Sequence, residues 1–163
     1  YKKDLTSQIL KNNKFIEYSP LSLKYLKEIS KTIKSNNGGL LLIDYGFSSQ
    51  SFRDTLQAIE KHKFANILGN IGNRDITYNL NFNFLKKFIS NLKNLKSLCT
   101  TQRNFLLKMG IIERAEIISK NLLFSKKAEI FYRVNRLIDK NKMGELFKVM
   151  FITKNNSSFK LGF

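Results

Sequence analysis

Helical spacing of apolar residues is clearest early in the chain, where it predicts a helix from Pro20 to about residue 36. Ser19 is placed to cap the N-terminus, and Pro20 fits the first helical position because an N–H there would have no helical partner. The stretch Asn36–Gly39 then supplies residues that tolerate the left-handed conformation of a helix C-cap. The predicted buried face of this helix is formed by Leu26, Ile29 and Ile33.

The sequence GGLLLIDYG follows this helix and changes the pattern from helix to strand. Its apolar run, Leu40–Ile43, offers no polar position for either face, which is typical of a strand buried on both sides in a parallel sheet. The run ends on Asp44, Tyr45 and Gly46. It therefore predicts a strand whose end reaches the surface at a ligand-facing loop.

The rest of the pattern predicts an α/β fold. Residues 47–78 mix short apolar patches, glycines and polar turns, and we expect them to form an irregular functional loop region. Strands near 40, 97 and 150 are joined by helices over about 81–95 and from 103 to about 140, and residues 154–163 form a tail. The apolar face of the 81–95 helix is assigned to Phe84, Leu85, Phe88 and Leu92.

Composition narrows the classes of partner. The 163 residues fit one ordinary domain, and no apolar run approaches the roughly 20 residues that a membrane-spanning helix needs. The formal net charge of +17 favours a nucleic-acid partner at first sight. The lysines, however, are spread through every segment and accompany abundant Asn, Ile and Phe, as the codons of an AT-rich genome would impose. We therefore expect no specific nucleic-acid partner, only weak and salt-sensitive binding.

The single cysteine and the single histidine are far apart and do not form a structural zinc site. Cys99 has no second cysteine to pair with, which fits a reducing compartment. Its apolar context, LKSLCT, predicts a small buried side chain and not a nucleophile. The chain opens on Tyr1 and not on Met, which is consistent with a piece of a longer protein.

A glycine-rich cofactor turn, which would lie between a strand and a helix, is missing from the sequence. SNNGGLL precedes a strand and has the wrong order, and ILGNIGNRDI lacks the surrounding strand and helix.

Six segments carry a family resemblance, and they occur in the family's order. They are FIEYSPLSLKYLKEI, GGLLLIDYG, DTLQAIEKHKF, GNRDITYNLNF, TQRNFLLKMGIIER and KMGELFKVM. From about Phe15 to the end, the sequence resembles the second half of the MidA-like class I S-adenosylmethionine-dependent methyltransferases. One departure is Asn81, where the family usually has Asp.

The resemblance implies a Rossmann-like class I methyltransferase fold, C-terminal part only, with a helical insertion over about 103–140. Residues 1–163 would then be the C-terminal portion of one methyltransferase domain. The cofactor S-adenosylmethionine would be bound mainly by an N-terminal half, which is the first expected partner. A protein substrate, such as a subunit of respiratory complex I, is the second. The implied location is the bacterial cytoplasm, or the mitochondrial matrix in a eukaryote.

The resemblance also suggests catalytic residues, because a mitochondrial relative methylates an arginine. A guanidinium stays protonated, so a site that holds it needs carboxylates, and Asp44 and Asp75 are the candidates. His62 is a candidate acceptor for the departing proton. Structural roles remain open for all three: an Asx-type cap for Asp44, an N-cap-like turn for Asp75 and a surface position for His62.

Five further residues are candidates for contact with the substrate. Tyr45 and Gly46 would shape the wall of the pocket, and Thr77 could orient the neighbouring Asp75. Thr55 lies in the DTLQAIEKHKF motif, and Gln102 is either a substrate contact or a structural hydrogen-bonding residue at the end of a strand.

Residues 103–124 allow two interpretations. Their Phe, Leu and Lys residues could form an amphipathic helix on a membrane surface, but the spacing fits core packing equally well. We favour core packing or a partner-docking surface over the membrane surface. For the whole chain three functions compete: the second half of a working methyltransferase, an inactive remnant of a split or decaying gene, and a basic nucleic-acid-binding module.

Overall fold

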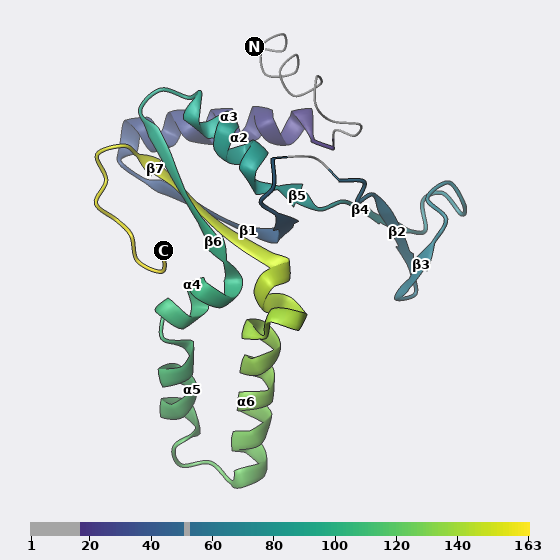
Figure 1. The fold of residues 1–163 in the computed structure, drawn as a ribbon, viewed down its shortest axis with the longest axis vertical. Coiled ribbons are helices and arrows are strands. Elements are labelled where there is room, and N and C mark those ends of the chain that lie inside the picture. The colour runs from purple at the N-terminus through teal and green to yellow at the C-terminus, as the bar shows by residue number, and fades with distance from the viewer. Residues whose placement is uncertain (1–16, 51–52) are drawn as a thin grey trace.

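A four-stranded mixed sheet lies at the centre of the molecule (Figure 1). The computed structural model describes residues 17–50 and 53–163. The strand order is β5 (Leu80–Asn81), β1 (Gly39–Phe47), β7 (Phe147–Lys154) and β6 (Leu95–Thr101). β5 is parallel to β1, whereas β7 runs antiparallel to both β1 and β6. The strands expected near 40, 97 and 150 are confirmed, and one reversed strand separates two that run in the same direction.

Helix α2 (Pro20–Asn36) begins and ends as its sequence predicts. The Ser22 N–H donates to Ser19 Oγ at 3.1 Å, and Asn37 closes the helix with φ 54°. The predicted buried face is wrong at one position, because Ile29 is 40% exposed.

Ser30 is buried in place of Ile29, on the same face of α2 as Leu26 and Ile33. Its hydroxyl donates to the Leu26 carbonyl at 2.6 Å, so this polar atom is buried with its hydrogen bond formed. A serine can occupy the core side of a helix in this way, which hydropathy alone does not show.

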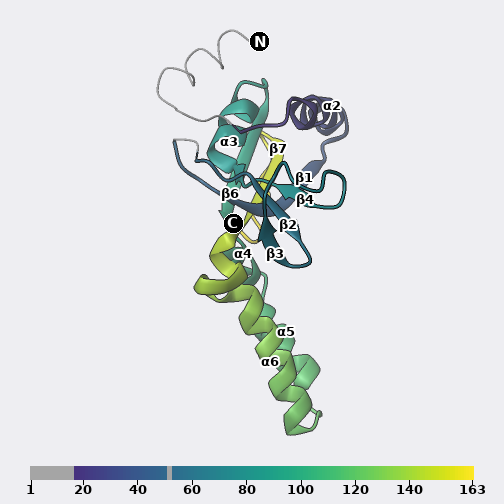
Figure 2. The ribbon, with the colours of Figure 1, turned by 90° about the vertical axis from the view of Figure 1, so that its right-hand side faces the viewer.

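Helix α3 (Phe82–Ser90) packs beside α2 on the same face of the sheet (Figures 1 and 2). Their shared core includes Leu26, Ile33, Phe82, Phe84, Leu85, Ile89, Leu92, Leu95, Met150 and Ile152. The predicted face of this helix is confirmed for Phe84, Leu85 and Leu92, while Phe88 is only partly buried. Asn81 caps the helix, since its Oδ1 accepts from the N–H groups of Asn83 and Phe84, each at 3.1 Å.

The opposite face of the sheet is covered only in part. The segment after β7, expected to be a tail, folds back over this face: the Phe159 ring lies 4.8 Å from that of Phe151. Phe163 packs against Phe105 with ring centroids 5.4 Å apart, and the preceding Gly162 has φ 82°, which favours glycine.

Strand β1 is open on this same face. Leu41 is 45% exposed and Ile43 is 48% exposed. The prediction of a strand buried on both sides is therefore wrong for the described part of the chain. β5 pairs only with Gly46 and Phe47, so the outer edge of β1 from residue 39 to residue 45 has no partner strand among the described residues.

The helical region expected from 103 to about 140 is confirmed and lies between β6 and β7. It comprises α4 (Gln102–Lys108), α5 (Ile111–Ser119), α6 (Phe124–Ile138) and the short η1 (Lys140–Gly144). Helices α5 and α6 form a hairpin that projects away from the sheet (Figures 1 and 2). Within the described residues, no helix is both long and apolar enough to cross a membrane.

A second, smaller sheet replaces the irregular loop predicted for residues 47–78. Its antiparallel strands lie in the order β3 (Lys63–Ala65), β2 (Gln57–Glu60) and β4 (Asp75–Thr77). The turn between β2 and β3 places Lys61 and His62 at φ 49° and 64°. Such hairpin turns usually carry Asn or Gly, and their absence here hid the hairpin from the sequence pattern.

The loop beyond this hairpin is held by Glu60. Its carboxylate accepts from Arg74 Nε at 2.7 Å and from Asn70 Nδ2 at 2.9 Å, and Arg74 also donates to the Asn66 carbonyl. The hydrogen bond from Arg74, followed by that from Asn70, lowers the pKa of Glu60. The loop therefore has a fixed conformation despite its short apolar patches.

The N-cap at Asn81 gives a test of how α3 is held. Asn81→Ala removes the oxygen that accepts both N–H groups, and we expect the free energy of unfolding to fall by about 1 kcal/mol. Asn81→Asp keeps an accepting oxygen and should lose less. Chemical denaturation of the three proteins measures this difference, and equal stability of the Ala variant and the parent would contradict the assignment.

Candidate active site

Three of the candidate site residues, Asp44, Tyr45 and Gly46, lie together at the C-terminal end of β1. Asp44 is half-buried on the face that carries α3, and its Oδ1 accepts from the Tyr45 N–H at 2.8 Å. Tyr45 points to the other face, where its ring meets Phe147 edge-on at 5.9 Å between centroids. This bond reaches the next residue within β1 and not the N–H two residues on, so it is not the Asx-type cap of the following loop that the sequence allowed for Asp44.

A glycine is required at position 46, where β5 pairs in parallel with the end of β1. A Cβ at this position would lie 2.2 Å from the Leu80 carbonyl oxygen and 2.9 Å from the Phe82 ring. Both neighbours belong to well-packed structure, so any side chain would separate β5 from β1. The close backbone approach that glycine permits here is that of β5, and a role of Gly46 in the wall of a substrate pocket stays a prediction.

Glu17 fixes the chain segment next to this strand end. Its carboxylate accepts from the Thr55 hydroxyl at 2.6 Å, and from the N–H groups of Thr55 and Leu56 at 3.0 Å each. The Thr55 hydroxyl accepts in turn from the Asn79 N–H at 2.9 Å. One carboxylate thus connects the segment before α2, the start of the small sheet and the segment leading into β5.

The phenol of Tyr78 is half-buried and lies within reach of the charges of two carboxylates. Burial raises the pKa of its phenol above the ordinary value, and the charges of Glu17 and Asp44 raise it further. The phenol therefore stays protonated at neutral pH and can donate a hydrogen bond. We call Glu17, Asp44, Thr55, Tyr78 and Asn79 the β1-end cluster.

Thr77, Asp75 and His62 lie on the small sheet at increasing distance from this cluster. Thr77 Oγ1 accepts from Gln57 Nε2 at 3.2 Å, close to where the chain enters β5. Asp75 is exposed and lies two residues further out, about 7 Å along the strand.

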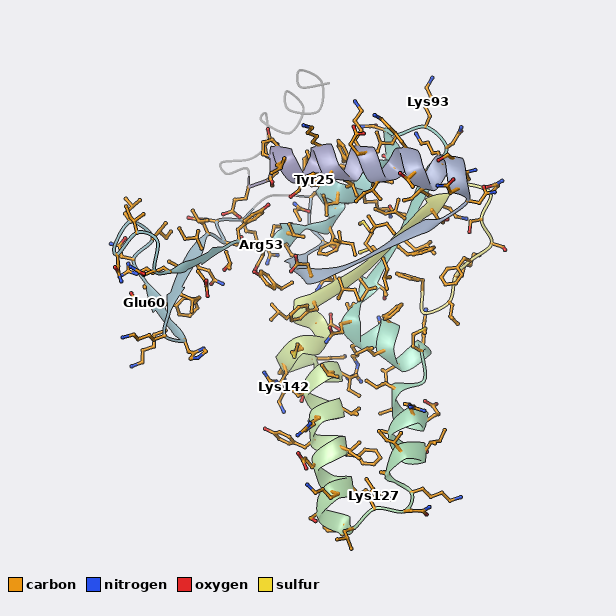
Figure 3. The ribbon with its side chains drawn as sticks, turned by 180° about the vertical axis from the view of Figure 1, so that it is seen from behind. Tyr25, Arg53, Glu60, Lys93, Lys127 and Lys142 are labelled. Atoms are coloured by element: carbon orange, nitrogen blue, oxygen red, sulfur yellow. The ribbon has the colours of Figure 1, made fainter. Side chains whose placement is uncertain are left out.

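His62 is exposed at the tip of the hairpin, beyond Glu60, which Figure 3 labels to one side of the main sheet. The structure joins Thr55 to Glu17 and places Tyr78 within reach of the charges of both Glu17 and Asp44, but it does not bring His62 to this cluster. A catalytic role for His62 and Asp75 stays a prediction.

Gln102 is buried at the start of α4. Its Nε2 donates to the Leu137 carbonyl at 2.9 Å, and Arg103 Nη1 donates to the Ile138 carbonyl at 2.7 Å. These bonds join the start of α4 to the end of α6, which is the structural role that the sequence allowed for Gln102. Contact of this side chain with a substrate stays a prediction.

Cys99 corrects one expectation, because its side chain is exposed and not buried. Neighbouring groups still remove part of its water, and this desolvation raises the pKa of the thiol; a hydrogen bond to Ser48 and the charge of Lys148 oppose the shift. A raised pKa leaves less thiolate, so Cys99 is not an activated nucleophile. Among the described residues, no group of His, Cys, Asp and Glu side chains could hold a metal ion.

Sequence reasoning missed three members of the β1-end cluster: Glu17, Tyr78 and Asn79. The first lies in FIEYSPLSLKYLKEI and the other two in GNRDITYNLNF, so each was inside a recognised segment. The segments marked the positions, but only the fold shows that they meet at one strand end.

The comparisons with known proteins agree with this geometry. A family model described as "Putative S-adenosyl-L-methionine-dependent methyltransferase" matches residues 1–101. The chain is 27% identical over 134 residues to the mitochondrial protein arginine methyltransferase NDUFAF7 of Xenopus tropicalis, covering 82% of this chain and 31% of that protein. It is 30% identical to the mouse protein of the same name, covering 81% of this chain and 30% of the other.

Two solved structures from Burkholderia thailandensis are also similar. One, described as a "likely methyl transferase" bound to S-adenosyl-homocysteine, has a TM-score of 0.65 and 26% identity, and the match covers 77% of this chain and 34% of that one. The other, an uncharacterized protein, has a TM-score of 0.75 at 22% identity over 99% of this chain and 46% of that one. The fold is Rossmann-like, and the chain spans about a third of the length of the curated relatives it matches.

Glu17 offers a test of how the β1-end cluster is assembled. Glu17→Ala leaves the half-buried N–H and hydroxyl of Thr55 and the exposed Leu56 N–H without their acceptor, so we expect a loss of about 2 kcal/mol in the free energy of unfolding. Glu28→Ala is the matched control, since Glu28 bonds only to the exposed Lys31. Denaturation curves that shift equally for both variants would show that the Glu17 bonds do not hold the cluster.

Proposed function

This chain belongs to a family of S-adenosyl-L-methionine-dependent methyltransferases, and on that premise we propose that it forms the second part of a class I methyltransferase domain. The observation that carries the proposal is the reversed strand β7 between β1 and β6, with a carboxylate at the C-terminal end of β1. Ligands of open α/β sheets bind outside such strand ends. We therefore propose that Asp44 is the residue of this part of the domain that binds the methyl acceptor.

The described residues do not supply a cradle for the cofactor. None of their glycines lies in a tight turn from a strand into a helix, which is the arrangement that approaches a nucleotide closely. When bound, S-adenosylmethionine would supply the methyl group. We propose that it is held mainly by an N-terminal half that packs along the open edge of β1, and that this half is the chain's first partner.

The acceptor that we propose is an arginine of a protein substrate, by analogy with the protein arginine methyltransferases that this chain resembles. Asp44 suits a guanidinium because a carboxylate can accept two parallel N–H bonds from it. Among the described residues Asp44 makes no ion pair, so its charge is not already neutralised. The neutral phenol of Tyr78 lies close enough to Asp44 to feel its charge and can donate to the same carboxylate or to the substrate.

The finer parts of the proposal concern the proton and the substrate. His62 would accept the proton that leaves the guanidinium only if the hairpin that carries it meets the bound substrate. A complex I subunit as the substrate, and a bacterial cytoplasmic or mitochondrial location, follow from the resemblance alone.

The first test is calorimetric titration of S-adenosylmethionine into this chain alone and into the chain co-expressed with the N-terminal half. We expect no heat of binding in the first case and saturable binding in the second. Binding to the isolated chain would contradict the proposal, because it would require a cofactor site within these residues. No binding in either case would favour an inactive remnant.

The second test places Asp44 in the reaction. In the two-part enzyme, Asp44→Asn should lower transfer of the methyl group to an arginine substrate by about 10- to 100-fold, since a charged hydrogen bond becomes a neutral one. Cofactor binding should be unchanged. Glu28→Gln on the exposed side of α2 is the control and should keep full activity. Equal rates for Asp44→Asn and the parent would remove Asp44 from the site.

A further inference from the structure

The end of the α5–α6 hairpin carries an exposed apolar tip. Leu122 and Leu123 lie in the turn between the two helices and Phe124 is the first residue of α6; their side chains are 45%, 79% and 86% exposed. This turn is the part of the molecule furthest from the main sheet, as Figure 1 shows and as the position of Lys127 in Figure 3 marks. We call residues 122–124 the hairpin tip.

The tip does not serve the packing of the hairpin. On α5 the buried residues are Ala115 and Ser119, and on α6 the buried residue is Ile138. Of the two favoured interpretations of the 103–124 segment, core packing is therefore wrong for the tip, while a docking surface stays a prediction. Large apolar side chains grouped at an exposed apex usually mark an interaction site.

Charge around the tip has one sign. Between residues 117 and 127 the charged side chains are Lys120, Lys126 and Lys127, and there is no Asp or Glu. Lys126 lies 3.5 Å from Glu129, one turn further along α6. The three lysines lie within about one helical turn, or 5 Å, of the apolar residues. This arrangement places cations directly behind an apolar end.

Two backbone groups of the turn are hydrogen-bonded. The Leu122 N–H donates to the Ser119 carbonyl at 3.1 Å, and the Leu123 carbonyl accepts from the Lys127 N–H at 3.0 Å. A polar backbone group that enters a low-dielectric layer without a partner costs several kcal/mol. That cost is avoided for these two groups, whereas the first N–H groups of α6 have no side-chain cap and need water or lipid phosphate as acceptors.

We propose that the hairpin tip inserts into the headgroup region of an anionic lipid bilayer, with Lys120, Lys126 and Lys127 against the lipid phosphates. A convex apolar apex with a cationic rim fits such a surface, where apolar burial and attraction to anionic lipid add together. The tip also points away from the open edge of β1, so a partner that completes the sheet would leave it free. Because no described helix could cross a membrane, the contact is one of surface attachment.

The protein contains no Trp, so one substitution makes a clean fluorescent probe. Phe124→Trp should shift its emission to shorter wavelength when vesicles of phosphatidylcholine and phosphatidylglycerol are added, and brominated lipids should quench it. Phosphatidylcholine alone should give a much weaker response. Phe64→Trp is the matched control, because Phe64 is 79% exposed on the small sheet. No shift for Phe124→Trp, or equal shifts for both probes, would overturn the proposal.

A second measurement separates insertion from attraction by the net charge of +17. Leu123→Ser and Phe124→Ser together keep every charge and should lower co-sedimentation with the anionic vesicles at least about tenfold. Ile71→Ser changes an 85% exposed residue on the small sheet and should have no effect. Circular dichroism establishes that each variant is folded. Unchanged binding by the double variant would show an attraction by charge alone, and the tip would not be a membrane anchor.

Discussion

The pairing of β7 with both of its neighbours is the interaction on which the rest of the structure depends. β7 aligns with β1 from Tyr45 at one end to Gly39 at the other, and with β6 along the whole of that strand. The contacts with β1 join positions more than a hundred residues apart in the chain. They bury Met150 and Ile152 completely beneath α2 and α3, so the sheet and its helical layer form together.

The same pairing positions the candidate site and the hairpin. β1 is held straight along β7, so its C-terminal end, with Asp44, meets the segments that carry Glu17 and Tyr78. The helices between β6 and β7 have both ends fixed in adjacent strands, and bonds from Gln102 and Arg103 close their base. A hairpin anchored in this way can extend far from the sheet without packing against it.

Much of this could be predicted from the sequence, because local signals were strong. The spacing of apolar residues predicted the strands and the helical region. Residues with a strong conformational preference predicted the caps of α2. The small sheet could not be predicted, since its turn uses Lys61 and His62 in place of Asn or Gly. Ser30, buried through its own hydrogen bond, and Cys99, exposed in an apolar context, show that hydropathy does not report burial at single positions.

The candidate site was predictable in its motifs but not in its geometry. Asp44 and Thr55 were found because they lie in recognised segments, while Glu17 and Tyr78 join them only through contacts across the fold. The open face at Leu41 and Ile43 was hidden for a related reason. In the proposed complete domain, further chain covers this face of β1. The strand would then have the composition of a buried strand, although the described residues leave Leu41 and Ile43 exposed.

The central claim is that this sheet is completed along the outer edge of β1. Residue-resolved hydrogen exchange of the N–H groups in Gly39–Tyr45 tests it most directly, with the chain alone and in complex with the N-terminal half. The account predicts that the N–H groups pointing away from β7 exchange fast in the isolated chain and are strongly protected in the complex. Protection that is the same in both states would contradict it.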